Sequence, residues 1–492
     1  MLKKTILLVL ALGLALSAVV LVRAQGLESR QPVEVESVAI PVDEEGSLLR
    51  FAEALRIPTI SFENVEDTDS AQFRALHDHF VLAYPGVHAE LTREIVGGLS
   101  LLYTWEGTEP ELPPVVLMGH QDVVPVIPGT EDDWEQAPFG GVVADGFIWG
   151  RGSMDNKISV VAILEAVEAL VADGFRPRRT HYLAFGHDEE VGGMLGAAAI
   201  AELLESRGAE PYAYVMDEGG VVARGLVPGI EGPVAIIGVA EKGYVNLELV
   251  VKGPGGHSSA PPENTNIGIL AAAITRLEDN PFPASLDGPA LDMFRYLAPE
   301  MGLAGRALFA NEWLTAPLIK WGLLSSPSSA AMLRTTTAVT IVEGGVKANV
   351  LPIEARAIVN HRIRPGETSQ TVREYVTSVI DDDRVEVNFS GGEGFDPSPI
   401  SDPAGPAFQL LARTVQEVVQ SDRVFVTPYL VTGGTDAKHY SGRSANVFRF
   451  IPAPVEPDAL QRVHGTNERM TPDGFFSSIR FFRRLIQNSD DL

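Results

Sequence analysis

Four short motifs place histidine and acidic side chains beside glycines or at the ends of apolar runs: GHQD at residues 119–122, GRGSMDNK at 150–157, HDEE at 187–190 and MDE at 216–218. Taken singly, each is typical of a turn, a loop ion pair or a solvated helix face. Because most of them follow an apolar, strand-like run, the four together indicate one shared site. The chain contains no cysteine, so a metal here would be bound by imidazole and carboxylate groups, which suit zinc.

A pair of zinc ions offers a specific chemistry for such residues. A bridging carboxylate lets two cations sit about 3.5–4 Å apart and activate one water molecule for attack on a carbonyl. A carboxylate that does not bind metal must then accept and relay the proton. Glu189 and Glu190 can divide these tasks, because successive side chains at a strand end point in different directions. The residues alone do not rank the two glutamates; they predict a cluster formed by His120, Asp155, Glu189, Glu190 and Asp217.

These motifs require elements that bring distant parts of the chain together. Residues 47–240 alternate between strand-like and helix-like patterns, which predicts an α/β layer structure. Apolar runs at 114–118, 182–185 and 213–216 predict buried strands, and residues 156–172 have helical spacing. Since functional clefts in α/β sheets lie beyond the carboxyl ends of strands, we expect the motifs to meet there.

A second, smaller domain is predicted within the chain, which at 492 residues exceeds the size of one hydrophobic core. From about Glu241 the pattern changes, and residues 244–251 and 355–362 partly alternate, as in a sheet with one solvated face. We therefore predict an α+β domain at 241–393, inserted between the two parts of a catalytic domain at 47–240 and 394–492. Residues 279–334, rich in Leu, Ala, Phe, Trp and Pro, predict a helical enlargement of this small domain.

As a set, the motifs resemble those of the co-catalytic zinc metallopeptidases (metallopeptidase family twenty), which include carboxypeptidase S, aminoacylase, glutamate carboxypeptidase and succinyl-diaminopimelate desuccinylase. The resemblance extends from about Ser47 to the C-terminus and rests on MGHQDVVP, GRGSMDNK, GHDEEVGG, GPGGHSSAP, ANVLP, HGTNE and the strand ending in Asp217. It implies a three-layer α/β zinc-peptidase catalytic domain with an inserted, ferredoxin-like lid or dimerisation domain. The segments RFIPAPVEPDALQRVHGTNE and GGTDAKHY look most like the extracellular branch that hydrolyses and forms N-fatty-acyl amino acids.

The resemblance also implies a set of metal ligands. It calls for two Zn²⁺ ions, with Co²⁺ or Mn²⁺ as substitutes, and for a cis peptide bond after the bridging residue. The implied ligands are His120 and Asp217 for one ion, Glu190 and His464 for the other, and Asp155 as the bridge. Asn156 is a departure, because many members have an acid there, but it removes no ligand.

Other residues gain roles from the same resemblance. The implied catalytic residues are Glu189 as general base, Asp122 as supporter of His120, and His257 as the oxyanion-stabilising residue of the small domain. Without the resemblance, His257 would be interpreted as a turn residue among glycines. The implied contacts to the substrate's carboxylate or backbone are Asn349, Arg362, Gly434, Thr435, Asp436 and Lys438. A plain turn is the alternative for the loop at 433–436.

Composition and the N-terminus restrict the partners and the location. With 65 acidic and 38 basic side chains the net charge is −27, which disfavours nucleic acid and anionic membranes as partners. Lys3 and Lys4 precede an apolar run at 5–22, which predicts either a cleaved export signal or a retained membrane anchor within residues 1–25. Both place the catalytic part outside the cytoplasm, either exported (secreted or periplasmic) or anchored, after a linker at 26–46. The resemblance leaves a monomer and a homodimer open.

The sequence therefore predicts a zinc-dependent hydrolase of amide bonds next to an amino acid with a free carboxylate, either a carboxypeptidase or an N-acyl-amino-acid hydrolase. Composition also motivates the hypothesis that residues 279–334 cover an apolar pocket for a long acyl chain. Three alternatives are a dipeptidase or aminopeptidase-type enzyme, an inert binding protein for amino-acid derivatives, and a structural surface protein. Glu189 argues against the binding protein, since a binder needs no base.

Overall fold

The computed structural model describes residues 2–32, 35–225, 227, 229–419, 423–455 and 459–492. Its largest element is a mixed sheet with strand order β1-β2-β6-β3-β7-β17-β9-β8-β18, in which β16 also pairs with β9. The strands are β1 (Thr92–Val96), β2 (Ser100–Trp105), β3 (Val115–His120), β6 (His181–Gly186), β7 (Tyr214–Asp217), β8 (Val222–Arg224), β9 (Pro233–Glu241), β16 (Phe425–Val431), β17 (Val447–Arg449) and β18 (Pro454–Val455). Strands β6, β3, β7 and β17 are parallel neighbours, so their carboxyl ends share one edge.

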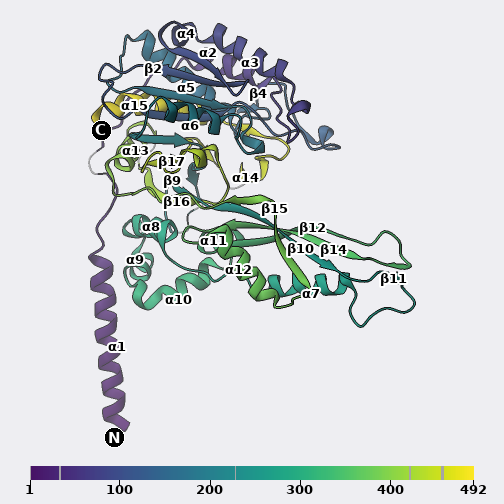
Figure 1. The fold of residues 1–492 in the computed structure, drawn as a ribbon. Helices are drawn as coiled ribbons and strands as arrows, with labels where there is room; N and C mark the ends of the chain where they lie inside the picture. Colours follow the sequence, from purple (N-terminus) through teal and green to yellow (C-terminus); the bar gives the residue numbers. More distant parts are fainter. Residues whose placement is uncertain (1, 33–34, 226, 228, 420–422, 456–458) are drawn as a thin grey trace.

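Helices cover both faces of this sheet, which confirms the predicted layered α/β architecture (Figure 1). In β3, Val115 and Leu117 point into one core, whereas Val116 and Met118 point into the other. Because both faces are buried, the strand is a continuous apolar run. The first core includes α2 (Glu44–Leu55), α3 (Ser70–Ala83), α4 (Pro85–Glu90), α5 (Lys157–Ala172), α13 (Pro406–Val418) and α15 (Pro472–Asn488); the second includes α6 (Ala197–Ser206).

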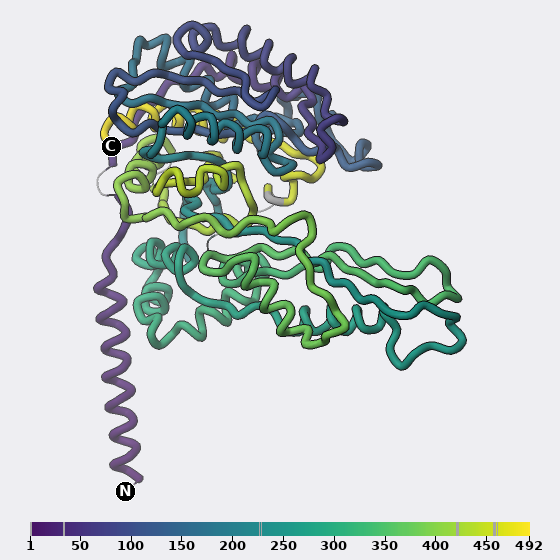
Figure 2. The backbone as a smooth tube through the Cα atoms, viewed as in Figure 1, coloured from purple at the N-terminus to yellow at the C-terminus, as the bar shows by residue number. Residues whose placement is uncertain are grey.

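The chain leaves the large sheet after β9 and builds a second, antiparallel sheet of order β12-β14-β10-β15. Its strands are β10 (Gly243–Lys252), β12 (Thr336–Gly344), β14 (Glu354–Ile363) and β15 (Val385–Phe395). Helices α7 (Asn266–Asp279) and α12 (Ser369–Ile380) share a core with it. The tube in Figure 2 shows how far this small domain extends to one side, where β11 (Gly256–His257) pairs with β13 (Val350–Leu351).

Four helices follow α7 in the segment expected to enlarge the small domain: α8 (Gly288–Leu297), α9 (Leu303–Ala310), α10 (Glu312–Leu323) and α11 (Pro327–Leu333). They share their core with the large sheet instead, which differs from that expectation. Met293 and Leu297 of α8 pack with Val234 of β9 and Phe425 of β16. The composition indicated apolar helices, but it carried no information about which sheet they would cover.

The N-terminal helix α1 (Leu2–Gln25) projects away from the rest of the molecule (Figure 1). It is long and apolar enough to cross a membrane, with a mean hydropathy of 2.9 over its most apolar 18 residues. The segment after it is attached to the catalytic domain. The buried Gln31 side chain donates to the carbonyl of Val426 at 2.9 Å and accepts from the N–H of Val426 at 2.7 Å.

Candidate metal centre

Two groups of potential metal ligands lie at the carboxyl edge of the large sheet and share one aspartate. His120, the last residue of β3, has its Nε2 atom 3.1 Å from Asp155 Oδ1 and 3.1 Å from Glu218 Oε1. On the other side, His464 Nε2 lies 2.9 Å from Asp155 Oδ2 and 3.2 Å from Glu190 Oε2. Asp155 thus offers one oxygen to each group, as a bridging ligand would, and the peptide bond after it is cis.

Glu218, the residue that follows β7, occupies a position in the site that was predicted for Asp217. Among the described residues, Glu218 joins His120 and Asp155 in a ligand group, whereas Asp217 does not. The buried Asp217 carboxylate instead accepts the backbone N–H of Ala437 through Oδ2 at 2.7 Å. Glu218 was not among the predicted ligands, although it is the next residue of the same motif. The assignment of Asp217 as a ligand stays a prediction.

Asp122 contacts both the His120 imidazole and the backbone of Glu189 and Glu190. Its Oδ1 atom accepts the N–H of Glu189 at 3.2 Å and lies 3.4 Å from His120 Nδ1. Its Oδ2 atom accepts the N–H of Glu190 at 3.1 Å and the hydroxyl of Ser61 at 2.6 Å. Burial alone would raise the pKa of Asp122, but the bonds from His120 and Ser61 hold it below the ordinary value. The carboxylate is therefore kept charged where it positions both halves of the site.

A buried ion pair joins the loop that carries Asp155 to the loop that carries His464. Arg151 donates to Glu468 Oε2 at 2.6 Å and to the carbonyl of His464 at 3.2 Å. At distances of 2.8–3.2 Å, Glu468 Oε1 accepts three backbone N–H groups, those of Gly152, Met154 and Asp155. Neither Arg151 nor Glu468 was predicted to have a role, although they lie in the GRGSMDNK and HGTNE motifs. Their separation of 317 residues hid the pairing.

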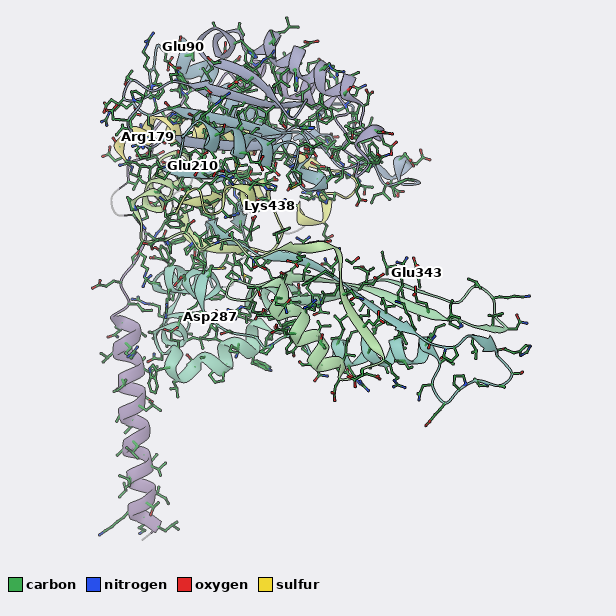
Figure 3. The ribbon with its side chains drawn as sticks, viewed as in Figure 1. Glu90, Arg179, Glu210, Asp287, Glu343 and Lys438 are labelled. Atoms are coloured by element: carbon green, nitrogen blue, oxygen red, sulfur yellow. The ribbon has the colours of Figure 1, made fainter. Side chains whose placement is uncertain are left out.

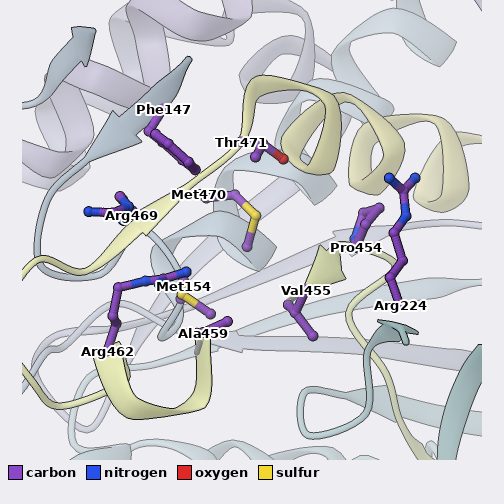
Figure 4. A pocket seen from close by; sticks show the side chains of 10 residues that line it. All are labelled: Phe147, Met154, Arg224, Pro454, Val455, Ala459, Arg462, Arg469, Met470 and Thr471. Atoms are coloured by element: carbon purple, nitrogen blue, oxygen red, sulfur yellow. The ribbon is translucent and has the colours of Figure 1, made fainter. Parts of the chain in front are cut away.

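A small cavity lies beside this ion pair and is lined by Met154, Phe147 and side chains from residues 454–471 (Figure 4). The strands around it come from two sheets: β8 and β18 belong to the large sheet, and a separate sheet consists of β4 (Val142–Ala144), β5 (Phe147–Trp149) and β19 (Arg469–Met470). The helix beside it is α14 (Ala459–Arg462). Its volume is about 80 Å³, which is far below the roughly 300 Å³ of small ligand pockets. It is therefore no substrate pocket.

The charge of the cluster fits bound cations. Burial and neighbouring carboxylates raise the pKa of Glu190, of Asp217 and, to about 8, of Glu218. The buried Oε1 atom of Glu190 has no hydrogen-bond partner among the described residues. Burying several acids without compensation is unfavourable, whereas a metal ion would satisfy both the charge and the unpartnered oxygen.

Glu189 belongs to neither ligand group, and it opens the short helix η3 (Glu189–Val191) beside them. Burial, followed by the nearby carboxylates, raises its pKa well above the ordinary value, although His120 acts in the opposite direction. A general base that works near neutral pH needs a raised pKa of this kind.

Of the predicted substrate residues, Arg362 and Asp436 lie close enough to Glu189 for their charges to interact. Arg362 stacks over the ring of Tyr244 at 4.8 Å, and Lys438 lies over the ring of Phe395 at 5.4 Å. A Cβ atom on Gly434 would lie 3.3 Å from Phe395 and 3.8 Å from Arg362, so this glycine sits between them. Figure 3 places Lys438 on the side of the catalytic domain that faces the small domain. Both cations therefore line the junction of the two domains.

Thr435 and Asp436, the other two predicted substrate residues of the 434–438 loop, contact side chains and backbone of the catalytic domain. Thr435 donates its N–H and its hydroxyl to Glu241 Oε2, at 3.1 and 2.8 Å. The buried carboxylate of Asp436 packs against the GHDEEVGG loop, where a Cβ atom on Gly193 would lie 2.0 Å from Oδ1. These contacts fix the loop against the sheet, while Gly434 and Lys438 face the domain junction.

A scan of protein families matches Peptidase family M20/M25/M40 to residues 116–488. The chain belongs to this family. It is 39% identical over 444 residues to a probable carboxypeptidase S-like 2 of Dictyostelium discoideum, covering 90% of this chain and 84% of that protein. It is 40% identical over 441 residues to the N-fatty-acyl-amino acid synthase/hydrolase PM20D1 of Xenopus tropicalis, covering 89% and 84%. The chain is thus a metallopeptidase-type hydrolase.

Solved structures confirm the fold of this M20 chain. An M20 family metallo-carboxypeptidase, Sso-CP2 from Sulfolobus solfataricus, matches with a TM-score of 0.65 and 19% identity. The match covers 91% of this chain and 99% of that one.

His257, with its implied catalytic role, and Asn349, with its implied substrate contact, lie far from the metal ligands. His257 and Asn349 are exposed and adjacent, since His257 lies in β11 and the N–H of Ser258 donates to the carbonyl of Asn349 at 3.2 Å. Figure 1 shows β11 at the outer end of the small domain, away from β2, β9 and β17 of the large sheet. Within one chain, the structure therefore does not bring these two residues to the cluster.

Proposed function

We propose that the protein is a two-zinc hydrolase that cleaves the amide bond between an acyl group and an amino acid with a free carboxylate. The observation that carries this proposal is the pair of ligand groups that share Asp155, with Glu189 beside them but outside both. The named activities of the relatives, carboxypeptidase S-like and N-fatty-acyl-amino acid synthase/hydrolase, support the substrate class.

The residues divide the work of hydrolysis. Two Zn²⁺ ions, when bound, would polarise the amide carbonyl and make a water molecule more acidic. The proposed ligands are His120, Asp155, Glu190 and His464, with either Asp217 or Glu218 completing the first group. Glu189 accepts a proton from the attacking water and passes it to the leaving nitrogen, so that the amine departs neutral.

The carboxylate of the substrate is proposed to bind at the domain junction. Arg362 is partly buried there, and its guanidinium can make two parallel hydrogen bonds to a carboxylate. Lys438 adds a second positive charge, and Gly434 leaves room for backbone approach. This arrangement favours a product amino acid with a free carboxylate over an internal peptide segment.

For the acyl group, we propose an apolar chain, as in the named activity of the N-fatty-acyl-amino acid synthase/hydrolase relatives. A cavity of about 480 Å³ lies between α8 and residues 364–367. Its lining combines the apolar side chains of Ala290, Met332, Ile400 and Leu430 with the charged side chains of Asp287, Arg364 and Glu367. Its volume is within the roughly 300–1,000 Å³ typical of ligand sites. We propose that the segment 279–334 contributes to acyl-chain binding through the residues with which it lines this cavity, which include Ala290 and Met332.

The test is turnover of an acyl-amino-acid panel by metal-loaded protein. N-oleoyl amino acids should be hydrolysed faster than N-acetyl amino acids, and C-terminal amides of both should be poor substrates. Equal or better N-acetyl turnover would contradict the acyl pocket alone. Rapid cleavage of dipeptides with a free N-terminus, together with no acyl-amino-acid turnover, would favour the dipeptidase alternative. No turnover of any amide would overturn the proposal.

A further inference from the structure

Helix α10 presents large apolar side chains to the surroundings. The exposed fractions are 57% for Trp313, 44% for Leu314, 57% for Leu318 and 73% for Trp321. Single exposed apolar residues are ordinary, but a contiguous apolar patch on a soluble surface usually marks a contact site.

These side chains form one continuous face. At 100° per residue, positions 313, 314, 317, 318, 321 and 324 fall within one arc of about 140°. All six positions are exposed, and each carries Trp, Leu or Pro. Ile319 lies on the opposite side and is only 4% exposed, so α10 packs on the protein through that side. A helix that faced water would have polar residues on its outer arc.

The neighbour of α10 is the docked end of α1. Helix α9 contacts both α1 and α10. The Arg23 side chain donates to the carbonyl of Ala310 at 3.0 Å, and Asn311, just before α10, donates to the carbonyl of Val20 at 3.1 Å. Ala24 is fully buried. The last turn of α1 is therefore fixed to the α9–α10 unit, while the rest projects.

The length of the projecting part matches a bilayer. The apolar run at residues 5–22 spans about 27 Å as a helix, close to the roughly 30 Å of a hydrocarbon core. Figure 1 shows α9 and α10 beside the docked end of α1, on the side of the molecule toward which α1 projects. A membrane that held α1 would therefore have its surface next to α10.

We propose that α10 is an interfacial membrane helix, whose outer face enters the headgroup region of the same bilayer that α1 spans. Tryptophan is the side chain most typical of that region, and an amphipathic helix binds there through its apolar face. Because the protein carries a net charge of −27, we expect apolar contact with zwitterionic lipid rather than attraction to anionic lipid. This inference does not depend on the proposed hydrolase function.

The tryptophans themselves provide the experiment. Full-length protein is reconstituted into phosphatidylcholine vesicles with plain or brominated acyl chains, since bromine quenches only nearby indoles. The other three tryptophans, Trp105, Trp134 and Trp149, are at most 9% exposed. We expect brominated lipid to lower the emission by at least a quarter, and the double variant W313F/W321F to lose that difference. The control W134F should retain it.

A second pair of variants tests the apolar face. L314E/L318E should abolish the quenching while flotation still shows vesicle-bound protein, because α1 is intact. The matched control is I341E/V342E, on exposed positions of β12 in the small domain, which should quench as the parent does. Equal emission in plain and brominated lipid would overturn the proposal. So would protein that fails to float with vesicles, or a tryptophan emission that shifts with protein concentration instead, which would indicate a second copy on this face.

Discussion

The metal cluster and the outer tip of the small domain both carry residues with implied catalytic roles, but the protein holds them in opposite ways. Asp122 is fully buried, and its two oxygens meet four groups from three parts of the chain. His257 is exposed, in a two-residue ladder with Val350 and Leu351.

This difference indicates what each region can do alone. The cluster is organised before any ligand arrives, because buried hydrogen bonds fix its side chains in a region of low dielectric. At the tip, His257 is held by contacts on the surface instead: it pairs with Val350, and its Nδ1 atom accepts the N–H of Ser259 at 3.1 Å. It can act only when closure of the small domain, or a second copy of the chain, brings it to a metal centre.

Metal removal should have the largest effect, since it acts on the organised region as a whole. We expect chelation to abolish turnover and Zn²⁺ to restore it. In the metal-free protein, hydrogen bonds to Asp155 and Glu190 raise the pKa of His464 to about 10. Below that pH the imidazole holds a proton that a cation must displace, so metal uptake at pH 7.5 releases protons and the release declines as the pH rises through 10.

Calorimetry in buffers of different ionisation enthalpy measures this release. Uptake without proton release at pH 7.5 would contradict the placement of His464 in the cluster. The chelated wild-type protein at pH 11 is the reference, because His464 is then neutral.

Glu189→Gln should have the next largest effect, with loss of about 10²–10⁴-fold in kcat. Glutamine keeps the shape of the side chain but cannot accept the proton. Metal content should be unchanged, because Glu189 lies outside both ligand groups. Comparison with Glu131→Gln, at the start of the exposed 3-10 helix η2 (Glu131–Asp133), controls for the amide substitution. Lost metal would show that Glu189 is a ligand, and full activity would overturn the mechanism.

The sequence predicted the strands and the helix around the metal cluster far better than it predicted the small domain and helices α8–α11. Strands such as β3 and the helix α5 were recognisable, because burial on both faces leaves a continuous apolar run and a helical period. His464 was found only by resemblance. The choice between Asp217 and Glu218 depends on the turn after β7, and the pairing of Arg151 with Glu468 depends on tertiary structure. Neither has a local signal.

The position of α8–α11 was also beyond the sequence. Their composition indicates burial, but the partner surface on β9 and β16 is set by the topology that brings those strands to one edge. Likewise, the motif around His257 suggested a catalytic role, while only the structure places its strand, β11, at the outer end of the small domain (Figure 1).

His257→Ala tests the exposed region directly. If His257 stabilises the oxyanion, its loss should reduce kcat by about 10²–10³-fold with metal content unchanged. Mixing this variant with Glu189→Gln distinguishes the two routes. A site built from two copies regains about a quarter of the wild-type activity on random pairing, because half of the dimers are mixed and each has one complete site.

Closure within one chain would give no recovery on mixing. Unchanged activity of His257→Ala would remove this residue from the mechanism altogether. Together, these results show whether His257 reaches a metal cluster, and whether that cluster belongs to the same chain or to a second copy.

Glu468→Gln should have the smallest effect of the four, because it touches no substrate and no predicted ligand side chain. It accepts the backbone N–H of Asp155 and pairs with Arg151, so its loss loosens the bridge and the His464 loop together. We expect about 10–100-fold weaker metal affinity, and excess Zn²⁺ should restore most of the kcat. Competition with a fluorescent chelator measures the affinity, and Glu131→Gln serves again as the control. An unchanged metal affinity would show that the buried hydrogen bonds of Glu468 do not hold Asp155 in place for the metal. Burial would then not explain why the metal cluster, unlike the tip of the small domain, is organised before a ligand binds.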